Sequence, residues 1–107
     1  MTRIEIKPLS VNEVFQGRRF RTKKYDVYEM QVKRLLPDMI VPDGNLFISY
    51  KVGYSNKLSD IDNFVKPFQD ILQKRYGFND SRIYKVIIEK VIVKKGCEFV
   101  EFEIKTL

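Results

Sequence analysis

The sequence contains no histidine and no tryptophan, and Cys97 is its single cysteine among 107 residues. Without histidine there are no Ser–His or Cys–His nucleophile pairs, no histidine-ligated zinc and no histidine general base. One thiol forms neither an intramolecular disulfide nor a zinc site, which favours a reducing, intracellular compartment. The chemistry left to this chain is that of carboxylates, lysine, tyrosine and metal-bound water.

Long apolar runs are missing as well. No stretch approaches the roughly 18 apolar residues of a membrane-spanning helix. The first ten residues, MTRIEIKPLS, alternate charge with hydrophobe and do not have the pattern of a signal peptide. We therefore expect a protein that neither spans a membrane nor is exported.

Positive charge is abundant. Lysine and arginine number 20 against 14 aspartates and glutamates, which gives a net charge of +6. Such a protein is attracted to polyanions, most often nucleic acid, although some basic domains are merely soluble and bind nothing specific.

The hydrophobic patterns predict one domain over residues 1–107 with the element order β-α-β-α-β-β. Strands are expected at 2–8 and 45–54, a β-hairpin over 82–104, and helices at 24–36 and 61–76. Residues from 10 to the first helix are polar and basic and are expected to form a loop. This pattern indicates an α+β fold, a mixed sheet with two helices packed against it.

The two predicted helices each have a candidate buried face. In the first helix the apolar residues with mostly helical spacing are Val27, Met30, Val32, Leu35 and Leu36. In the second helix they are Ile61, Phe64, Val65, Phe68, Leu72 and Tyr76.

The segment SDIDNFVKPFQD, residues 59–70, concentrates acidic residues in a basic chain. A helix cap would explain Asp60 or Asp62 but not both, and it would not explain Asp80 before the predicted hairpin. Two carboxylates one residue apart can point at one cation, and a third from another loop would complete an oxygen cage. Lys66 and Asp70 follow at four-residue steps, and as a plain salt bridge they would add only a few tenths of a kcal/mol.

A basic run, RRFRTKKY, lies just before and at the start of the first predicted helix. Its five cations attract phosphates, and the aromatic residues between them can stack on bases. The run could also be a solvated loop, with Phe20 in the core. The candidate DNA-binding cations are Arg18, Arg19, Arg21, Lys23 and Lys24.

DIDNFVKPFQDIL followed by GFNDSRI closely resembles the core motif of the RusA family of Holliday junction resolvases. The opening PLSVNEVF is similar to that family's Pro-x-Ser-x-Asn-x-x-aromatic start, with Ser10, Asn12 and Phe15 in place. The resemblance runs roughly over residues 8–103 and is weak between the first predicted helix and Ser59.

This resemblance implies an endodeoxyribonuclease that depends on Mg²⁺, with Mn²⁺ as a substitute, and needs no organic cofactor. Such an enzyme acts as a homodimer on branched DNA, the four-way junctions of recombination and repair. Asp60, Asp62 and Asp80 match the family's metal-binding catalytic carboxylates, Lys66 its catalytic lysine and Asp70 a further acidic position. A short, dedicated resolvase suits a phage or prophage, and hence the cytoplasm of a bacterial cell or an infected host.

Other positions take supporting roles in this hypothesis. Asp70, Asn63 and Asn79 are expected beside the catalytic residues, and Asn12 is expected to contact DNA. Where many family members carry two adjacent acids, this chain has Asn79 followed by Asp80, which leaves the number of bound ions open. Pro67 predicts an irregular first turn in the second helix.

A homodimer would place two identical sites about one axis, matching the two-fold symmetry of a four-way junction. The candidate interface is apolar surface on the last two strands and the first helix, contributed by Val86, Ile88, Ile92, Phe99, Tyr25, Tyr28 and Met30.

Three alternatives remain open at the level of sequence. The first is a DNA-binding module without catalysis, which has no need of the acidic residues. The second is a different metal nuclease, built on Asp43 after Pro42 and on Glu103 with Lys105, and the third is a structural scaffold.

Overall fold

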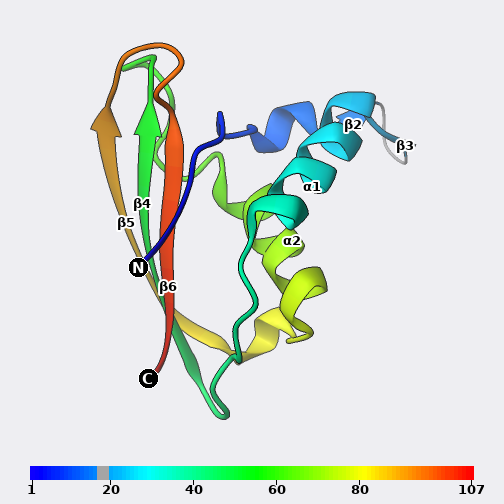
Figure 1. Cartoon of the computed structure of the whole chain (residues 1–107), viewed down its shortest axis with the longest axis vertical. Helices are drawn as coiled ribbons and strands as arrows, with labels where there is room; N and C mark the ends of the chain where they lie inside the picture. Colours follow the sequence, from blue (N-terminus) through cyan, green and yellow to red (C-terminus); the bar gives the residue numbers. More distant parts are fainter. Residues whose placement is uncertain (17–19) are drawn as a thin grey trace.

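A four-stranded mixed sheet forms the frame of the molecule, and two α-helices cover one of its faces (Figure 1). The structure is a computed structural model that describes residues 1–16 and 20–107. The sheet strands are β1 (Thr2–Ile4), β4 (Leu46–Tyr54), β5 (Ile83–Ile92) and β6 (Phe99–Thr106). The helices are α1 (Lys23–Leu35) and α2 (Val65–Tyr76), and the prediction of an α+β domain with a mixed sheet is confirmed.

Short elements connect this frame. Two 3-10 turns, η1 (Val11–Glu13) and η2 (Asp80–Arg82), precede the β2 strand and β5 respectively. The strands β2 (Phe15–Gln16) and β3 (Phe20–Arg21) pair with each other as a small second sheet. The segment that we expected to be a loop therefore has local structure of its own.

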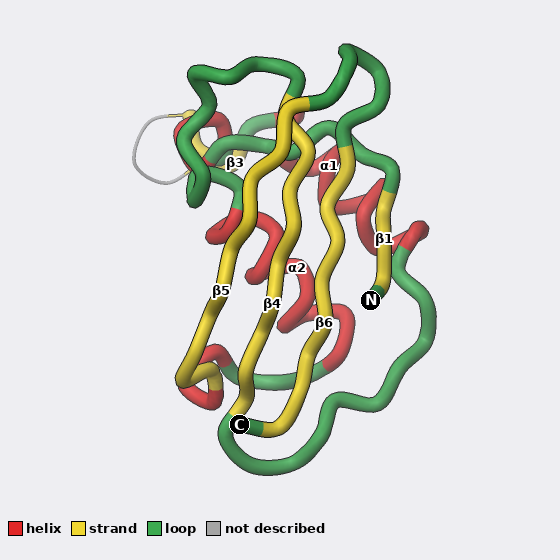
Figure 2. Tube along the Cα trace, turned by 90° about the vertical axis from the view of Figure 1, so that its left-hand side faces the viewer, coloured by secondary structure: helices red, strands yellow, loops and turns green. Residues whose placement is uncertain are grey.

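The predicted β-hairpin over 82–104 is wrong, because β5 and β6 are not neighbours. The strand order is β1-β6-β4-β5, so β4 lies between them (Figure 2). β4 pairs with β5 in parallel, across the connection through α2, and with β6 in antiparallel. Both runs have the composition of strands, but composition does not say which strand is inserted between them.

One face of β4 provides the floor of the core. Alternate residues Leu46, Ile48, Tyr50 and Val52 are buried toward the helices. The predicted alternation on this strand is confirmed for the first three of them. Because β4 is the central strand, this row meets side chains of both helices and of β6.

Aromatic rings join α2 to the sheet. The ring of Phe64 lies edge-on to Tyr50, with centroids 5.3 Å apart, and 6.4 Å from Phe68. Phe68 in turn packs edge-on against Phe102 of β6 at 5.7 Å. Edge-to-face pairs are a favoured arrangement of aromatic side chains. This cluster fixes the start of α2 above the end of β4.

The buried face of α1 differs from the prediction. The helix buries Tyr25, Tyr28 and Val32, whereas the expected Val27, Met30 and Leu35 are exposed. Leu36, just after the helix, is buried as expected. Tyrosine rings carry large apolar surfaces, so the two tyrosines outweigh the aliphatic residues in setting which face turns inward.

The second helix starts later than predicted. Residues 61–64 form turns, and α2 begins at Val65. Ile61 is 43% exposed and not part of the core. Pro67 lies in the first turn of α2, where an N–H has no partner within the helix, so the proline is tolerated there.

In the described part of the chain, no helix combines the length and the apolar character needed to cross a membrane.

Three buried tyrosines should make the protein less stable in alkaline solution. Burial raises the pKa of Tyr28, Tyr50 and Tyr54 above the ordinary 10.0, for Tyr54 to about 12. The unfolded chain releases these protons at a lower pH than the folded chain. The free energy of unfolding should therefore decrease as the pH rises from about 10 through 12. Melting temperatures measured over this range would test it, and a constant melting temperature would contradict it.

Candidate active site

Asp60 and Asp62 lie in the turn between the end of β4 and the start of α2, and both are exposed. The N-cap of α2 is Phe64, which makes no side-chain cap hydrogen bond. The carbonyl of Asp62, not its carboxylate, accepts from the Val65 amide at 3.1 Å. Neither carboxylate is used as the helix cap, so capping does not explain these two residues.

Asn63 connects this acidic turn to the N-terminal segment. Its side-chain amide donates to Asp60 Oδ2 at 3.4 Å, and its carbonyl accepts from the Val11 amide at 2.9 Å. Val11 begins η1, which Ser10 caps at its start. The two motifs that resemble a family signature lie about fifty residues apart in the sequence but are in direct contact in the fold.

The hydroxyl of Tyr54 faces the same turn. Tyr54 is 8% exposed, and its hydroxyl has no hydrogen-bond partner of normal geometry among the described residues. Burial raises the pKa of this hydroxyl to about 12, and the negative charges of Asp62 and Asp60 act in the same direction. Both carboxylates are thus within electrostatic reach of one unpaired donor.

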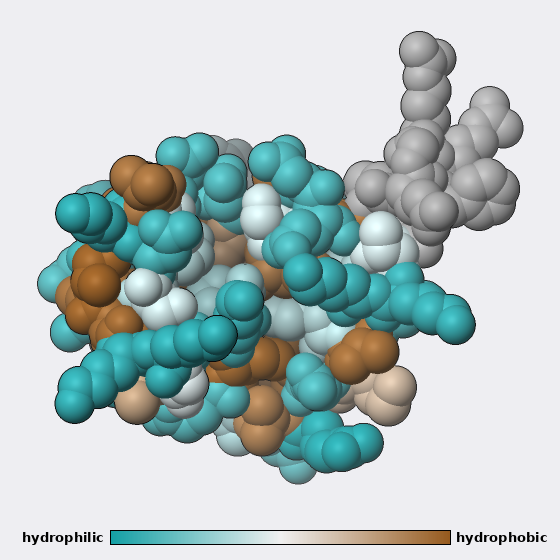
Figure 3. Space-filling model, turned by 90° about the horizontal axis from the view of Figure 1, so that it is seen from above, coloured by the Kyte–Doolittle hydropathy of each residue, from teal (hydrophilic) through white to brown (hydrophobic). Residues whose placement is uncertain are grey.

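A polar cleft of about 270 Å³ opens beside the acidic turn. Its lining combines the N-terminal segment, the end of β4 and the following loop, and includes Lys7, Ser10, Tyr54, Asn63 and Glu98. Seen from above, this end of the molecule is largely hydrophilic and is hollowed near its middle (Figure 3). The cleft places polar groups and water next to the two carboxylates.

Lys66 and Asp70 form the expected pair on the exposed side of α2. Lys66 Nζ donates to Asp70 Oδ1 at 3.0 Å, and Gln73 Nε2 donates to the same oxygen at 3.4 Å. Gln73 Oε1 in turn accepts from the backbone amide of Asp80 at 3.1 Å. A chain of hydrogen bonds therefore runs along α2 from Lys66 to Asp80.

Asp80 lies at the opposite end of α2 from Asp60 and Asp62. The helix has 12 residues, and at about 1.5 Å per residue it separates the two positions by roughly 18 Å. Within the described residues, no three histidine, cysteine, aspartate or glutamate side chains are grouped so that they could hold a metal ion. The expectation that the three aspartates meet within one chain is wrong, because β4 and β5 are parallel and the acidic positions fall at their opposite ends.

Asn79 also has a local role. Its side chain accepts from the Ser81 amide at 2.8 Å and so caps η2. Of the three supporting residues expected from the sequence, Asp70 contacts Lys66 and Asn63 contacts Asp60, whereas Asn79 is occupied by this cap.

The residues of the acidic turn are compatible with a divalent ion. Among the described residues, neither Asp60 nor Asp62 takes part in a salt bridge, so their oxygens are available as ligands. Carboxylate oxygens are the ligands that Mg²⁺ prefers, usually one or two of them with several waters. The unpaired Tyr54 hydroxyl next to them is a donor for such a water.

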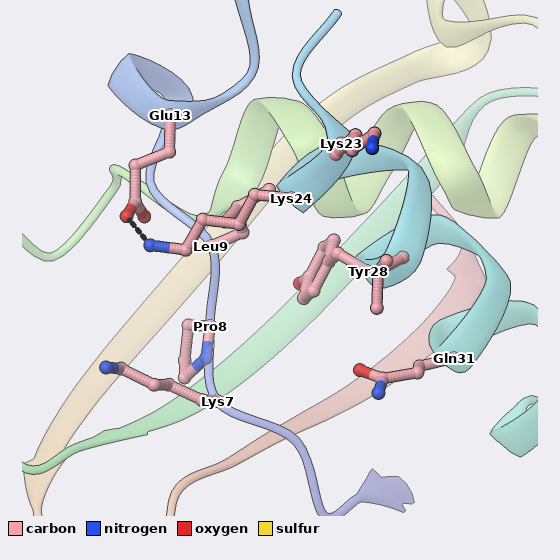
Figure 4. A pocket seen from close by; sticks show the side chains of 9 residues that line it. Lys7, Pro8, Leu9, Glu13, Lys23, Lys24, Tyr28 and Gln31 are labelled. Atoms are coloured by element: carbon pink, nitrogen blue, oxygen red, sulfur yellow. Dashed lines mark hydrogen bonds and ion pairs between the residues drawn. The ribbon is translucent and has the colours of Figure 1, made fainter.

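Positive charge flanks the N-terminal side of the site. Lys7, Lys23 and Lys24 line a second cleft of about 370 Å³ between the N-terminal segment and α1 (Figure 4). Lys24 forms an ion pair with Glu13, and the hydrogen bond from Lys24 lowers the pKa of that carboxyl group. Asn12 lies exposed in η1, near this cleft.

Part of the predicted DNA-binding run falls outside the described structure. Arg18 and Arg19 lie outside the described residues, and the side chain of Arg21 is not described either. Their proposed contacts with DNA remain predictions.

Comparison with known families identifies the chain. The model of the family described as Endodeoxyribonuclease RusA matches residues 9–105. The chain belongs to the RusA endodeoxyribonuclease family. No individually curated protein matches it significantly.

Family membership accounts for most of the chain. The RusA match includes the opening segment, the acidic turn and Asp80, and it confirms the resemblance recognised in the sequence. It supports endodeoxyribonuclease activity and the Holliday junction resolvase activity that the RusA family implies. It also argues against a scaffold without enzymatic activity.

Two residues near the RusA-type site were not singled out from the sequence. Tyr54 ends β4 and looked like one more strand aromatic, and only its buried, unpaired hydroxyl distinguishes it. Lys7 stands directly before Pro8 of the opening motif, and this neighbourhood was the one available signal.

Replacing Asp70 with Asn should slow DNA cleavage by about 10- to 100-fold, the usual effect of losing a supporting contact. The change removes the charge that holds Lys66 at 3.0 Å but leaves an amide of the same shape. Because exposed i,i+4 pairs contribute only about 0.3–0.5 kcal/mol, the melting temperature should hardly change. Cleavage rates and thermal melts test both parts, and a normal rate would show that Asp70 does not position Lys66.

Proposed function

We propose that this RusA-family protein is a Mg²⁺-dependent endonuclease that resolves four-way DNA junctions by paired phosphodiester hydrolysis in recombination and repair. The acidic turn supports the proposal best: Asp60 and Asp62 are exposed, uncapped and without salt bridges in the described structure, and lie beside the unpaired Tyr54 hydroxyl. Asp80 is proposed as the third catalytic carboxylate.

Each residue of the site has a proposed role. Asp60 and Asp62 would hold a divalent ion, which when bound would supply an activated water and neutralise charge on the scissile phosphate. Lys66 is a compact cation on the exposed face of α2 that can stabilise negative charge developing on the phosphate. Asp70 keeps Lys66 in place, and Tyr54 can donate a hydrogen bond into the site.

Basic residues on the N-terminal side of the site would hold the DNA. Lys7, Lys23 and Lys24 lie there together, and the arginines at 18, 19 and 21 are close to them in sequence. Changing Arg18, Arg19 and Arg21 to Ala should weaken binding and flatten its salt dependence by about one log–log unit per lost phosphate contact. Binding curves at several salt concentrations measure this slope, and an unchanged slope would exclude these residues from the interface.

The proposed enzyme works as a homodimer. A four-way junction has two-fold symmetry and must be cut in two opposed strands, whereas one chain carries one acidic turn. An isologous dimer supplies two identical turns about an axis that can coincide with that of the junction.

The test compares four-way, three-way and linear duplex DNA of matched sequence. We expect symmetric cuts in the four-way junction with Mg²⁺ or Mn²⁺ and none without a divalent ion. Binding without cleavage under all conditions would instead favour a DNA-binding module. Equal cleavage of the linear duplex would contradict junction resolution.

A further inference from the structure

β5 is a long edge strand whose outer side has no partner strand within the described residues. It is 10 residues long and pairs only with β4, whereas the opposite edge strand β1 has 3 residues (Figure 2). Natural proteins usually shorten, cover or charge such edges, because an open strand pairs readily with another chain. Here the edge is instead apolar and exposed, at Tyr84, Val86, Ile87 and Ile92.

The sequence of β5 is complementary to itself when two copies run antiparallel. We propose that β5 pairs with β5 of a second copy of this chain, with Ile87 on the two-fold axis. In this register Lys85 lies opposite the partner's Glu89, and Val86 lies opposite the partner's Ile88. Further out, Ile83 meets the partner's Val91, and Tyr84 meets the partner's Lys90. Every charge in the strand then faces an opposite charge or an aromatic ring.

The pairing of β5 with β4 assigns these residues to the two faces of the sheet. Lys85, Ile87 and Glu89 pair with Phe47, Ser49 and Lys51 and lie on the face away from the helices. Val86 and Ile88 pair with the buried Ile48 and Tyr50 on the helix face. The dimer would therefore have two ion pairs on the solvent side of the joined sheet and an extended apolar row under the helices.

Neighbouring registers lack this complementarity. Centring the pairs on Ile88 would set Lys90 opposite the partner's Val86 and Glu89 opposite the partner's Ile87. Centring them between Ile87 and Ile88 would set Lys85 opposite the partner's Lys90. Like charges directly opposite each other destabilise a strand pair, and opposite charges stabilise it.

This interface would also bring the separated aspartates together, an extension that rests on the proposed function. Lys90 Nζ donates to the carbonyl of Ser59 at 2.6 Å, so the segment leading to Asp60 lies against the end of β5. Asp80 lies three residues before Ile83, and in the proposed register the partner's Ile83 lies opposite Val91. The partner's Asp80 is thereby carried to the end of the sheet that holds Asp60 and Asp62. The site would be completed across the interface.

Charge exchange on β5 tests the interface without any assay of activity. Lys85→Glu alone and Glu89→Lys alone should each raise the dimer dissociation constant by about tenfold or more, because two like-charge contacts replace two ion pairs. The double variant should dimerise like the wild type, and the two single variants mixed together should form a heterodimer. Sedimentation velocity measures each case.

Two further variants complete this test. Lys105→Glu reverses an exposed lysine on the same sheet face but on β6, and it should leave dimerisation unchanged. Ile87→Lys places two cations at the axis and should give a folded monomer, since Ile87 is 48% exposed on the face away from the helices. A wild type that is monomeric, or single variants that dimerise as well as the wild type, would overturn the proposal.

The shared site has its own test in mixed dimers. If Asp80 acts across the interface, a dimer of Asp60→Asn with Asp80→Asn contains one intact site and one doubly altered site. It should therefore nick junctions, although each variant alone does not. If Asp80 acts within its own chain, both sites of the mixed dimer carry a defect and no nicking is expected.

A binding measurement separates this result from the activity itself. Mg²⁺ held by residues of both chains should tighten the wild-type dimer by linkage and have no such effect on Asp80→Asn. Sedimentation with and without Mg²⁺ detects the difference. Equal tightening in both proteins would overturn the shared site, whereas a wild type that forms this dimer but never cuts DNA would overturn the proposed function alone.

Discussion

Replacing Asp60 or Asp62 with Asn should abolish cleavage of four-way junctions while leaving junction binding intact. Each change removes a charged oxygen ligand but keeps the shape of the side chain. Losing a contact that only supports a metal ligand already lowers activity by 10- to 100-fold, so loss of a ligand should exceed about 100-fold. DNA affinity should stay equal or increase, because a carboxylate that repels phosphate is removed. Cleavage rates with Mg²⁺ and binding curves without divalent ions measure the two effects.

Asp43→Asn is the matched control for this experiment. Asp43 is also exposed, but it lies before β4, at the opposite end of the sheet from the acidic turn. Its replacement should change neither cleavage nor binding. Loss of activity in Asp43→Asn together with normal activity in Asp60→Asn would favour the alternative nuclease motif that begins at Pro42.

The local patterns in the sequence predicted the elements but not the order of the strands. Ile48 and Tyr50 alternate as a half-buried strand should, and Gly77 ends α2 with a φ of 70°, a conformation that glycine adopts without strain. The insertion of β4 between β5 and β6 depends instead on pairing over long distances. Near-continuous apolar strands such as β5 and β6 do not carry a mark of their neighbours.

The candidate site shows the same division. The roles of Asp60 and Asp62 could be predicted because two carboxylates one residue apart form a local signal, and the structure excludes their use as caps. The distance to Asp80 could not be predicted, since it depends on the direction of α2 between two parallel strands. The buried hydroxyl of Tyr54 was equally hidden, because its lack of a partner exists only once the turn has folded against it.

Phe64 connects the stability of the core to the position of the acidic turn. It is fully buried, contacts the rings of Tyr50 and Phe68, and stands two residues after Asp62. Phe64→Ala should lower the free energy of unfolding by about 3–5 kcal/mol, the usual effect of removing a buried phenylalanine side chain. It should also reduce cleavage, because the turn loses the ring that anchors it above the end of β4.

Phe102→Ala separates these two effects. Phe102 is buried in the same cluster and contacts Phe68, but it belongs to β6 and not to the turn. Both variants should be destabilised to a similar degree in thermal or urea unfolding. When cleavage is measured well below both melting temperatures, Phe64→Ala should be clearly slower than Phe102→Ala, because only the first removes the anchor of Asp60 and Asp62. Equal rates in the two variants would mean that Phe64 contributes stability alone and that the turn keeps its geometry without it.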